Sequence, residues 1–517
     1  LLAELDGAAD DGDRADLLCS SLVRGIMARW PDRACVVRHP GVFPVMVDRV
    51  RARFSAWYEM MVRSQGKDPG RGATFAEAER RLPVIAAMGF DTVYLLPIHP
   101  IGRVHRKGPD NTLVAKEGDP GSPYAIGSAE GGHTAIHPEL GTLDDFRHFV
   151  AEARRHNLEV ALDFAIQCAP DHPWIKRHPE WFQWRPDGSI RYAENPPKKY
   201  QDIVNVTFHG DGAEALWREL LAVVRFWVKQ GVRVFRVDNP HTKPIPFWEW
   251  LIGRIQDEHP DVLFLSEAFT RPKLMRALAK AGFSQSYTYF TWRNFKQELT
   301  DYLNELAQGE ARDYMRPHFW PVTPDILPPF LQTGGRAAFR IRLVLAATLS
   351  SLYGVYNGFE LCEAAAVPGK EEYLHSEKYQ HKVWDWDRPG NIKAEITRIN
   401  AIRRDNPALH EFENVRFFDA DDESVLFYGK STLDRTNQIF VAVCLDPFDV
   451  HEATLTFPLD RMGVPAGETY EVEELLSGRR HLWRGAAQKV RLDPQVNPAA
   501  IFRVTVWTSV DYRTPCF

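Results

Sequence analysis

Residues 232–238 read Val-Arg-Val-Phe-Arg-Val-Asp, and residues 263–267 read Leu-Phe-Leu-Ser-Glu. Both runs are short and largely apolar, as expected of buried strands in a parallel sheet, and both end in an acid. A third acid, Asp325, follows the run Val322-Thr323-Pro324. Acids at the ends of successive parallel strands meet at one mouth of a barrel, where barrel enzymes carry their chemistry. One such acid could cap a following helix, but three in order favour catalysis.

Eight strand patterns, most of them separated by helical patterns, occupy residues 53–413. Eight is the strand number of a closed parallel barrel, so the sequence predicts an α/β fold, the (β/α)8 TIM barrel. An open doubly wound sheet is the alternative, but no glycine-rich fingerprint follows the first strand. The strands are predicted at residues 54–60, 92–97, 158–166, 232–237, 262–266, 284–290, 317–322 and 350–356.

Three other segments do not show this alternation of strand and helix patterns. Residues 168–205 are rich in Pro, Trp and charge and too long for an ordinary loop, so they predict a small inserted domain after the third strand. Residues 414–517 alternate apolar and polar positions, which predicts a C-terminal antiparallel β-sandwich. Residues 1–52 are predicted to be a helical remnant of a truncated region, because the chain starts at Leu1 without a leader pattern.

Charge, apolar content and cysteine spacing limit which partners and which cellular compartment the sequence predicts. A net charge of -6 argues against nucleic acid as the main partner. The sequence contains no run of about twenty apolar residues, so it predicts no membrane-spanning helix. The six cysteines are scattered, without the paired spacing of a zinc site, which favours a reduced protein in the cytoplasm.

The three acids suit the chemistry of glycosidic bonds, where one carboxylate attacks and a second acid transfers protons. Arg236 projects to the same side of its strand as Asp238 and can keep that carboxylate ionised, which makes Asp238 the candidate nucleophile. Apolar neighbours should raise the pKa of Glu267, as a proton donor requires. Asp325 would then hold substrate hydroxyls.

Two basic segments lie in loops near the predicted mouth. The first, Asn195-Pro196-Pro197-Lys198-Lys199-Tyr200, carries two lysines, an amide and a phenol that could donate hydrogen bonds to a phosphate. A solvated basic turn is the alternative, and the segment by itself favours that interpretation. The second, residues 103–108, adds cations in the loop after the second strand and is followed by Asn111.

Three motifs bring these features together: Phe-Arg-Val-Asp-Asn-Pro-His (235–241), Ser-Glu-Ala-Phe (266–269) and Thr-Pro-Asp-Ile-Leu (323–327). They resemble the catalytic strands of glycoside hydrolase family 13, the α-amylase family, and Asp163 matches the acid of that family's third strand. Within the family, the chain is most similar to the maltosyltransferases that use α-maltose 1-phosphate, from about residue 54 through the C-terminal sandwich.

This resemblance implies a nucleophile at Asp238, an acid/base at Glu267 and a transition-state stabiliser at Asp325. The reaction it implies moves a maltosyl unit, with retention and through a covalent glycosyl-enzyme intermediate, to the non-reducing end of an α-1,4-glucan and releases phosphate. The substrate-binding residues expected from the loops and the resemblance are Lys107, Asn111, Gln167, Asn195, Lys198, Tyr200, Arg236, Asn239, Lys378 and Tyr379.

Departures from the amylases refine this expectation. Gln167-Cys168 replaces the usual Asn-His after the third strand and removes an amide linked to calcium, so no metal and no cofactor are predicted. Val322 stands where the resemblance predicts an asparagine. The expected partners are α-maltose 1-phosphate and an α-1,4-glucan acceptor, with a homodimer possible.

Two other functions remain open at this stage. An amylase-type hydrolase or glucan-rearranging enzyme would use the same three acids but would not need the lysines of residues 195–200. A catalytically inactive carbohydrate-binding protein is the third hypothesis, and the presence of all three acids counts against it.

Overall fold

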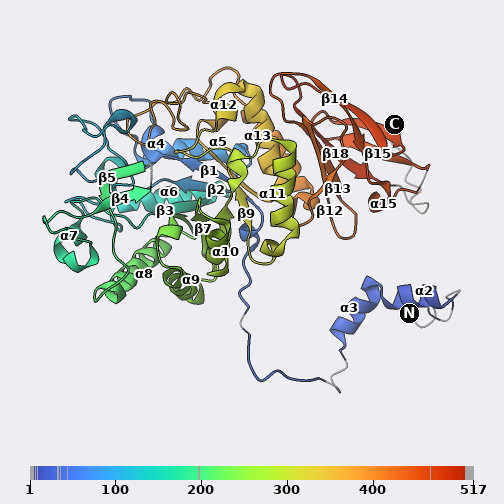
Figure 1. Cartoon of the computed structure of the whole chain (residues 1–517), viewed down its shortest axis with the longest axis horizontal. Coiled ribbons are helices and arrows are strands. Elements are labelled where there is room, and N and C mark those ends of the chain that lie inside the picture. Colours follow the sequence, from blue (N-terminus) through green and yellow to red (C-terminus); the bar gives the residue numbers. More distant parts are fainter. Residues whose placement is uncertain are drawn as a thin grey trace. The chain divides into compact units, whose positions relative to one another are not determined.

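The computed structural model describes residues 5, 7, 10–31, 34, 36–43, 45–195, 198–465 and 467–506 (Figure 1). The chain divides into two compact units, Leu1–Val47 and Asp48–Phe517. In the first unit, two helices are present, α2 (Asp11–Leu18) and α3 (Ser21–Arg29). Among the described residues, no helix combines the length and apolar character needed to cross a bilayer.

The second unit contains the predicted closed barrel, with parallel strands in the order β1-β10-β9-β8-β7-β6-β3-β2. Each of the eight predicted strand segments contains or overlaps one barrel strand, so the TIM-barrel prediction is confirmed. The strands are β1 (Ser55–Met60), β2 (Thr92–Leu95), β3 (Glu159–Phe164), β6 (Val234–Asp238), β7 (Leu263–Glu267), β8 (Gln285–Tyr287), β9 (Pro317–Phe319) and β10 (Leu352–Tyr356).

Strands β8 and β9 have three residues each, half or less of the predicted length, for local reasons. After β8 the Thr288 side chain accepts a hydrogen bond from the Phe290 amide and starts a 3-10 turn at Tyr289–Trp292. After β9 the chain reaches Pro321, which has no N–H for a ladder. Asp325 therefore lies on a tight turn beyond β9 rather than directly after the strand.

Helices surround the barrel (Figure 1). In α6, a capping box between Thr142 and Asp145 fixes the first turn, and Phe146, Phe149 and Val150 are buried. The apolar stripe at residues 75–88 forms two helices, separated by a 3-10 turn before Pro83. The helices of the barrel are α4 (Phe75–Ala78), α5 (Leu82–Ala87), α6 (Leu143–Arg155), α8 (Ala213–Lys229), α9 (Ile245–Glu258), α10 (Pro272–Lys280), α11 (Lys296–Gln308), α12 (Pro329–Thr333), α13 (Gly335–Leu349) and α14 (Lys393–Asp405).

Aromatic side chains fill the inside of the barrel. Trp57, Tyr94, Tyr287 and Trp320 are each at most 1% exposed and pack in one cluster. Gly354 in β10 leaves room for them, because a Cβ at this position would lie 2.4 Å from the Trp320 ring. The barrel is therefore a packed core, and its chemistry is confined to the mouth.

The segment between β3 and β6 forms the expected insertion. It contains α7 (Pro173–Arg177) and a hairpin of β4 (Tyr192–Asn195) and β5 (Lys198–Val204). Backbone hydrogen bonds join Cys168 and Val204 in both directions, at 3.0 and 2.7 Å. These bonds tie the hairpin to the turn that follows β3.

The C-terminal region is an antiparallel β structure, as predicted. Its sheets are β11-β12-β13-β18-β15-β16 and β14-β17, and both contribute side chains to one apolar cluster. The sequence pattern predicts strands at 425–428, 439–443, 453–457 and 501–506, which correspond to β12, β13, β14 and β18. It does not predict β11, which has three residues, or β15 to β17, which carry many charges. The region comprises β11 (Arg416–Phe418), β12 (Val425–Ser431), β13 (Gln438–Cys444), β14 (His451–Thr456), α15 (Leu459–Met462), β15 (Thr469–Glu474), β16 (Arg479–Arg484), β17 (Ala487–Leu492) and β18 (Ala499–Thr505).

Candidate active site

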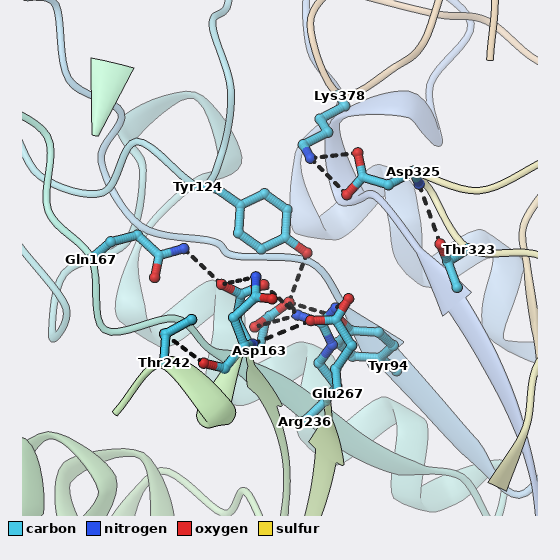
Figure 2. A network of polar contacts seen from close by, with 12 residues as sticks. Tyr94, Tyr124, Asp163, Gln167, Arg236, Thr242, Glu267, Thr323, Asp325 and Lys378 are labelled. Atoms are coloured by element: carbon cyan, nitrogen blue, oxygen red, sulfur yellow. Dashed lines mark hydrogen bonds and ion pairs between the residues drawn. The ribbon is translucent and has the colours of Figure 1, made fainter. Parts of the chain in front are cut away.

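Arg236 lies at the centre of the carboxylates at the barrel mouth (Figure 2). Its Nη1 is 3.0 Å from both Asp163 Oδ2 and Asp238 Oδ1, and its Nη2 is 2.8 Å from Glu267 Oε1. The strand register creates this cluster, because Asp163 pairs with Arg236 across β3 and β6, and Asp238 pairs with Glu267 across β6 and β7. One buried guanidinium thus serves three acids on adjacent strands.

Asp238 is held as an anion. Burial raises its pKa, but the positive charges of Arg236 and Lys243 and a hydrogen bond from Gln167 outweigh burial and leave the pKa below its ordinary value. The Gln167 amide donates to Oδ2 at 2.7 Å, and the Asn239 amide donates to the same oxygen at 3.3 Å. An ionised, oriented carboxylate of this kind can act as a nucleophile.

Glu267 has the opposite tendency. Burial raises its pKa to about 8, with the negative charge of Asp238 adding to the effect and Arg236 opposing it. The backbone N–H of Asn239 donates to Oε2 at 3.2 Å, which is possible because Asn239 adopts a left-handed conformation with φ of 43°. Two neighbouring acids with divergent pKa values are the pattern expected of a nucleophile and a proton donor.

Two further acids lie beneath this pair. Asp163 accepts hydrogen bonds from Tyr94 at 2.5 Å and Tyr124 at 2.9 Å, and burial raises its pKa to about 6. Glu59 of β1 is 1% exposed, and burial raises its pKa well above the ordinary value. The sequence analysis missed Glu59, although an acid within the apolar strand Ser-Ala-Trp-Tyr-Glu-Met was a usable signal.

Asp325 faces the other acids from the opposite side of the mouth, where Lys378 contacts it (Figure 2). Lys378 Nζ lies 2.8 Å from both carboxylate oxygens of Asp325 and 4.7 Å from the centre of the Tyr124 ring. Burial lowers the pKa of Lys378, but Asp325 and the tyrosines Tyr379 and Tyr200 outweigh burial and raise it. The ammonium group is therefore a permanent cation at the rim.

A narrow cavity of about 70 Å³ opens between these groups. Typical sites for small ligands exceed roughly 300 Å³, so this cavity by itself is smaller than an ordinary ligand site. The residues predicted from sequence that line the cavity are Asp238, Glu267, Asp325, Asn111, Gln167, Tyr200, Asn239, Lys378 and Tyr379. Four lining residues were missed, and no sequence pattern singled them out: Ser122, Tyr124, Asp202 and Ile203.

The remaining predicted site residues lie elsewhere. Arg236 is beneath the cavity, and its contacts are with acids of the protein. Lys107 is 2% exposed and donates to Oε1 of Gln201, a residue of β5, at 2.7 Å. The side chains of Asn195 and Lys198 lie outside the described part of the structure.

A second, larger cavity of about 540 Å³ adjoins the first, and Gln167 lines both. Its wall includes Arg191, Lys243 and His241, so it is rich in positive and hydrogen-bonding groups. Lys243 Nζ lies 3.3 Å from the carbonyl oxygen of Asn239. Burial lowers the pKa of Lys243, although Asp238 and Glu267 oppose this effect. The sequence analysis did not identify this cavity.

Among the described residues, one group of three side chains has the composition of a metal site. His133, Cys168 and His172 are buried, and their ligand atoms lie within 4.8 Å of one another. The Nδ1 atom of His172 accepts the backbone N–H of Trp174 at 3.0 Å, so the neutral ring carries its proton on Nε2. Because Nε2 of His172 carries this proton, it has no free lone pair with which to bind a metal.

Comparisons with known proteins identify relatives of this chain. The family model described as "GLGE, C-terminal" matches residues 417–504. A maltosyltransferase of Rhodospirillum rubrum is 61% identical over 98% of this chain and 73% of its own length. One of Myxococcus xanthus is 58% identical over 95% of this chain and 74% of its own length. Both are named alpha-1,4-glucan:maltose-1-phosphate maltosyltransferase.

Solved structures extend the comparison to the fold alone. A maltogenic alpha-amylase, AmyB, from Thermotoga neapolitana superposes with a TM-score of 0.70 at 21% identity, over 89% of this chain and 100% of that one. An alpha-amylase from Geobacillus thermoleovorans, complexed with acarbose, gives a TM-score of 0.70 at 16% identity over the same shares. With the barrel, its acids and the close relatives taken together, this chain belongs to the alpha-1,4-glucan:maltose-1-phosphate maltosyltransferase family.

Proposed function

We propose that this chain transfers a maltosyl unit from α-maltose 1-phosphate to the non-reducing end of an α-1,4-glucan, with retention and release of phosphate. The family supports the substrates, since the relatives are named for them. The observation that carries the mechanism is the divergence of two neighbouring acids. Asp238 has a lowered pKa, whereas burial raises the pKa of Glu267 to about 8.

In the first step, the Asp238 carboxylate attacks the anomeric carbon and the bond from that carbon to the phosphate oxygen breaks. Phosphate takes the bonding electrons, and Glu267 can supply a proton to the departing oxygen. Phosphate leaves more easily than a sugar alkoxide, so fixed positive charge contributes more than forceful protonation. The product is a maltosyl ester on Asp238, with inverted configuration.

In the second step, the 4-hydroxyl of the acceptor's terminal glucose attacks the same carbon and the ester bond to Asp238 breaks. Glu267, now ionised beside Arg236, accepts the hydroxyl proton. A second inversion gives overall retention. The acceptor would approach through the larger cavity, which meets the smaller one at Gln167.

The other predicted residues complete the proposal. Asp325 and Lys378 would hold sugar hydroxyls, and Asn195, Lys198 and Tyr200 would hold the phosphate. The proposed domains are an N-terminal segment at 1–52, the barrel at 53–413 and the sandwich at 414–517. A homodimer and a cytoplasmic location also remain proposals; the buried free thiols of Cys168 and Cys444 are compatible with a reducing compartment.

The decisive experiment incubates the purified chain with α-maltose 1-phosphate and a short malto-oligosaccharide, and measures phosphate and product length. We expect phosphate release with products that grow by two glucose units, and loss of both in Asp238→Ala. Shortened or rearranged oligosaccharide without phosphate release would favour the amylase-type function. No change in either substrate would favour an inactive binding protein.

The basic loop allows a second, matched comparison. Lys198→Ala should raise the KM for α-maltose 1-phosphate more than tenfold, because a phosphate ligand is lost. Lys199→Ala is the control, since successive residues of a strand face opposite sides. Equal effects of the two substitutions would mean that residues 195–200 form only a solvated basic turn.

A further inference from the structure

The turn after β3 controls how Asp238 is held. Gln167 lies in this turn, is 6% exposed and donates its amide to Asp238 Oδ2 at 2.7 Å. A half-turn about its last bond would point the amide oxygen at the carboxylate instead, and only the nitrogen is a favourable partner. The position of the turn decides whether the Gln167 amide lies within hydrogen-bond distance of Asp238.

Two buried histidines connect that turn to the inserted segment. The N–H of Trp174, in α7, donates to His172 Nδ1 at 3.0 Å. His172 Nε2 lies 3.2 Å from His133 Nδ1, and His133 Nε2 lies 2.9 Å from the carbonyl oxygen of Ala165. Ala165 directly follows β3 and is two residues before Gln167.

The protons of this chain have one consistent arrangement. His172 accepts at Nδ1, so its neutral ring donates from Nε2 to His133 Nδ1. His133 must then donate from Nε2 to Ala165. Burial lowers the pKa of His172 to about 3 and that of His133 well below its ordinary value, so both rings are neutral at physiological pH.

Packing holds the two rings in this position. The His133 ring is stacked on Trp174 at 4.7 Å between centroids. A Cβ on Gly127 would lie 2.0 Å from His172 Cδ2, and one on Gly132 would lie 2.4 Å from His172 Nε2. The two glycines thus allow the backbone to close around the His172 ring from two sides.

We propose that His133 and His172 are positioning residues: their hydrogen-bond chain from α7 to the Ala165 carbonyl fixes the turn that presents the Gln167 amide to Asp238. The inserted segment thereby contributes to the state of the nucleophile without touching substrate. This inference rests on the proposed role of Asp238. The hydrogen bond from His172 Nε2 to His133 Nδ1 also excludes a metal at His133, Cys168 and His172, because it uses the two nitrogen atoms that would bind the ion.

The test is a pH profile of kcat/KM for α-maltose 1-phosphate in His133→Phe and Gln167→Leu. Loss of the Gln167 hydrogen bond raises the pKa of Asp238, so the acid limb should move to higher pH in both variants, with about a tenfold fall in kcat/KM. The double variant should move no further than Gln167→Leu alone. His133→Gln, which keeps a donor for Ala165, should return towards wild type.

The other titratable and charged groups around Asp238 and the two histidines must be the same in every variant compared. The substitutions at His133 and Gln167 leave all of these groups in place. Around Asp238 they are Arg236, Asp163, Glu267, Lys243 and Lys378, and around the histidine pair they are His99, Cys168 and Arg177.

His99→Phe is the matched control. The His99 ring lies 5.9 Å from that of His133 but bonds to Ala135, outside the chain from α7 to Ala165. It should lower the thermal stability and leave the acid limb unchanged. A shift in His99→Phe, an unshifted limb in His133→Phe, or additive effects in the double variant would each overturn the inference.

Two further measurements test the inference if His133→Phe does not fold or if the wild type does not use α-maltose 1-phosphate. If His133→Phe does not fold, His172→Asn retains an acceptor for Trp174 but loses the donor to His133, and should shift the limb equally. If the wild type does not use α-maltose 1-phosphate, the proposed function fails and a crystal structure of either variant decides. Gln167 should then lie beyond hydrogen-bond distance of Asp238, and an unchanged contact would overturn the inference.

Zinc binding provides an independent check. The wild-type protein, equilibrated with Zn²⁺ and then desalted, should retain no more metal than Cys168→Ser. One equivalent of zinc in the wild type that is lost in Cys168→Ser would show a metal site and overturn the hydrogen-bond chain.

Discussion

Lys378 Nζ lies 2.8 Å from both carboxylate oxygens of Asp325. This pair joins the loop after β10 to the turn after β9 and forms one side of the narrow cavity. The side chain of Lys378 is 8% exposed and that of Asp325 is 42% exposed, so the cation is buried and the acid faces the cavity. Lys378 therefore holds the Asp325 carboxylate at the edge of the cavity.

We predict that Lys378→Met lowers kcat/KM for the maltosyl donor by about 10- to 100-fold, because Asp325 loses the charged donor that orients it. Steady-state kinetics with α-maltose 1-phosphate measure this. Lys382→Met is the control, since Lys382 follows on the same loop but lies over the Trp384 ring at 4.0 Å. Equal losses in the two variants would refute a specific role for Lys378.

Removal of the central cation should affect both stability and activity. Arg236→Met leaves Asp163, Asp238 and Glu267 without a shared partner, and breaking a buried ion pair costs about 3–5 kcal/mol. Urea unfolding measures the loss, and we expect no detectable turnover. Arg236→Lys retains the charge but not the forked geometry, so it should recover part of the stability with little activity. Full activity in Arg236→Lys would contradict this interpretation.

The pH dependence of the reaction should report on Glu267. Burial raises its pKa to about 8, so the acid is protonated at neutral pH and loses its proton as the pH rises through 8. We expect kcat/KM for α-maltose 1-phosphate to fall above about pH 8, because the proton donor of the first step is lost. Glu267→Gln should have low activity without this alkaline limb.

A donor that needs no proton separates this effect from others. With α-maltosyl fluoride, whose leaving group requires little acid assistance, the alkaline limb of the first step should disappear in the wild type. Persistence of the limb with the fluoride would assign it to a group other than Glu267.

Glu59 offers a prediction about stability. Burial raises its pKa well above the ordinary value in the folded state, so its contribution to stability is present below pH 4 and is lost as the pH rises towards that raised pKa. Glu59→Gln should remove this loss, so the variant should gain stability over the wild type as the pH increases from 4 to 8. Urea unfolding at both values measures the difference.

Glu59→Ala is the matched comparison, because it removes the same acid and also leaves a cavity in the barrel. It should cost about 2–5 kcal/mol relative to Glu59→Gln. If the stability difference between Glu59→Gln and the wild type does not change with pH, Glu59 does not carry a raised pKa.

Some errors of the sequence analysis have local causes. Strands β15 to β17 were missed because half or more of their positions are polar, and only one face contacts the apolar cluster. The surroundings of Lys107, which is predicted to bind substrate, could not be read from the sequence either: its ammonium group is buried and donates to Gln201. Loop conformation depends on distant contacts, so neither outcome can be read from local patterns.

The sequence by itself determined the barrel and the nature of its chemistry. Short apolar runs that end in acids must be buried parallel strands, and parallel strands bring their carboxyl ends together. Asp238 and Glu267 were therefore identifiable as one site from the sequence pattern, whereas Asp163 was recognised only through the family resemblance. The arginine two residues before Asp238 also had to share its face of the strand.

Only the tertiary structure decided how these groups are charged and held. The raised pKa values of Glu267 and Glu59 depend on burial, which is set by packing from every side of the barrel. The pairing of Lys378 with Asp325, and the chain from Trp174 through His172 and His133 to Ala165, connect residues from separate loops. Such contacts depend on how separate loops are oriented in the folded protein, and the spacing of residues along the chain does not determine this.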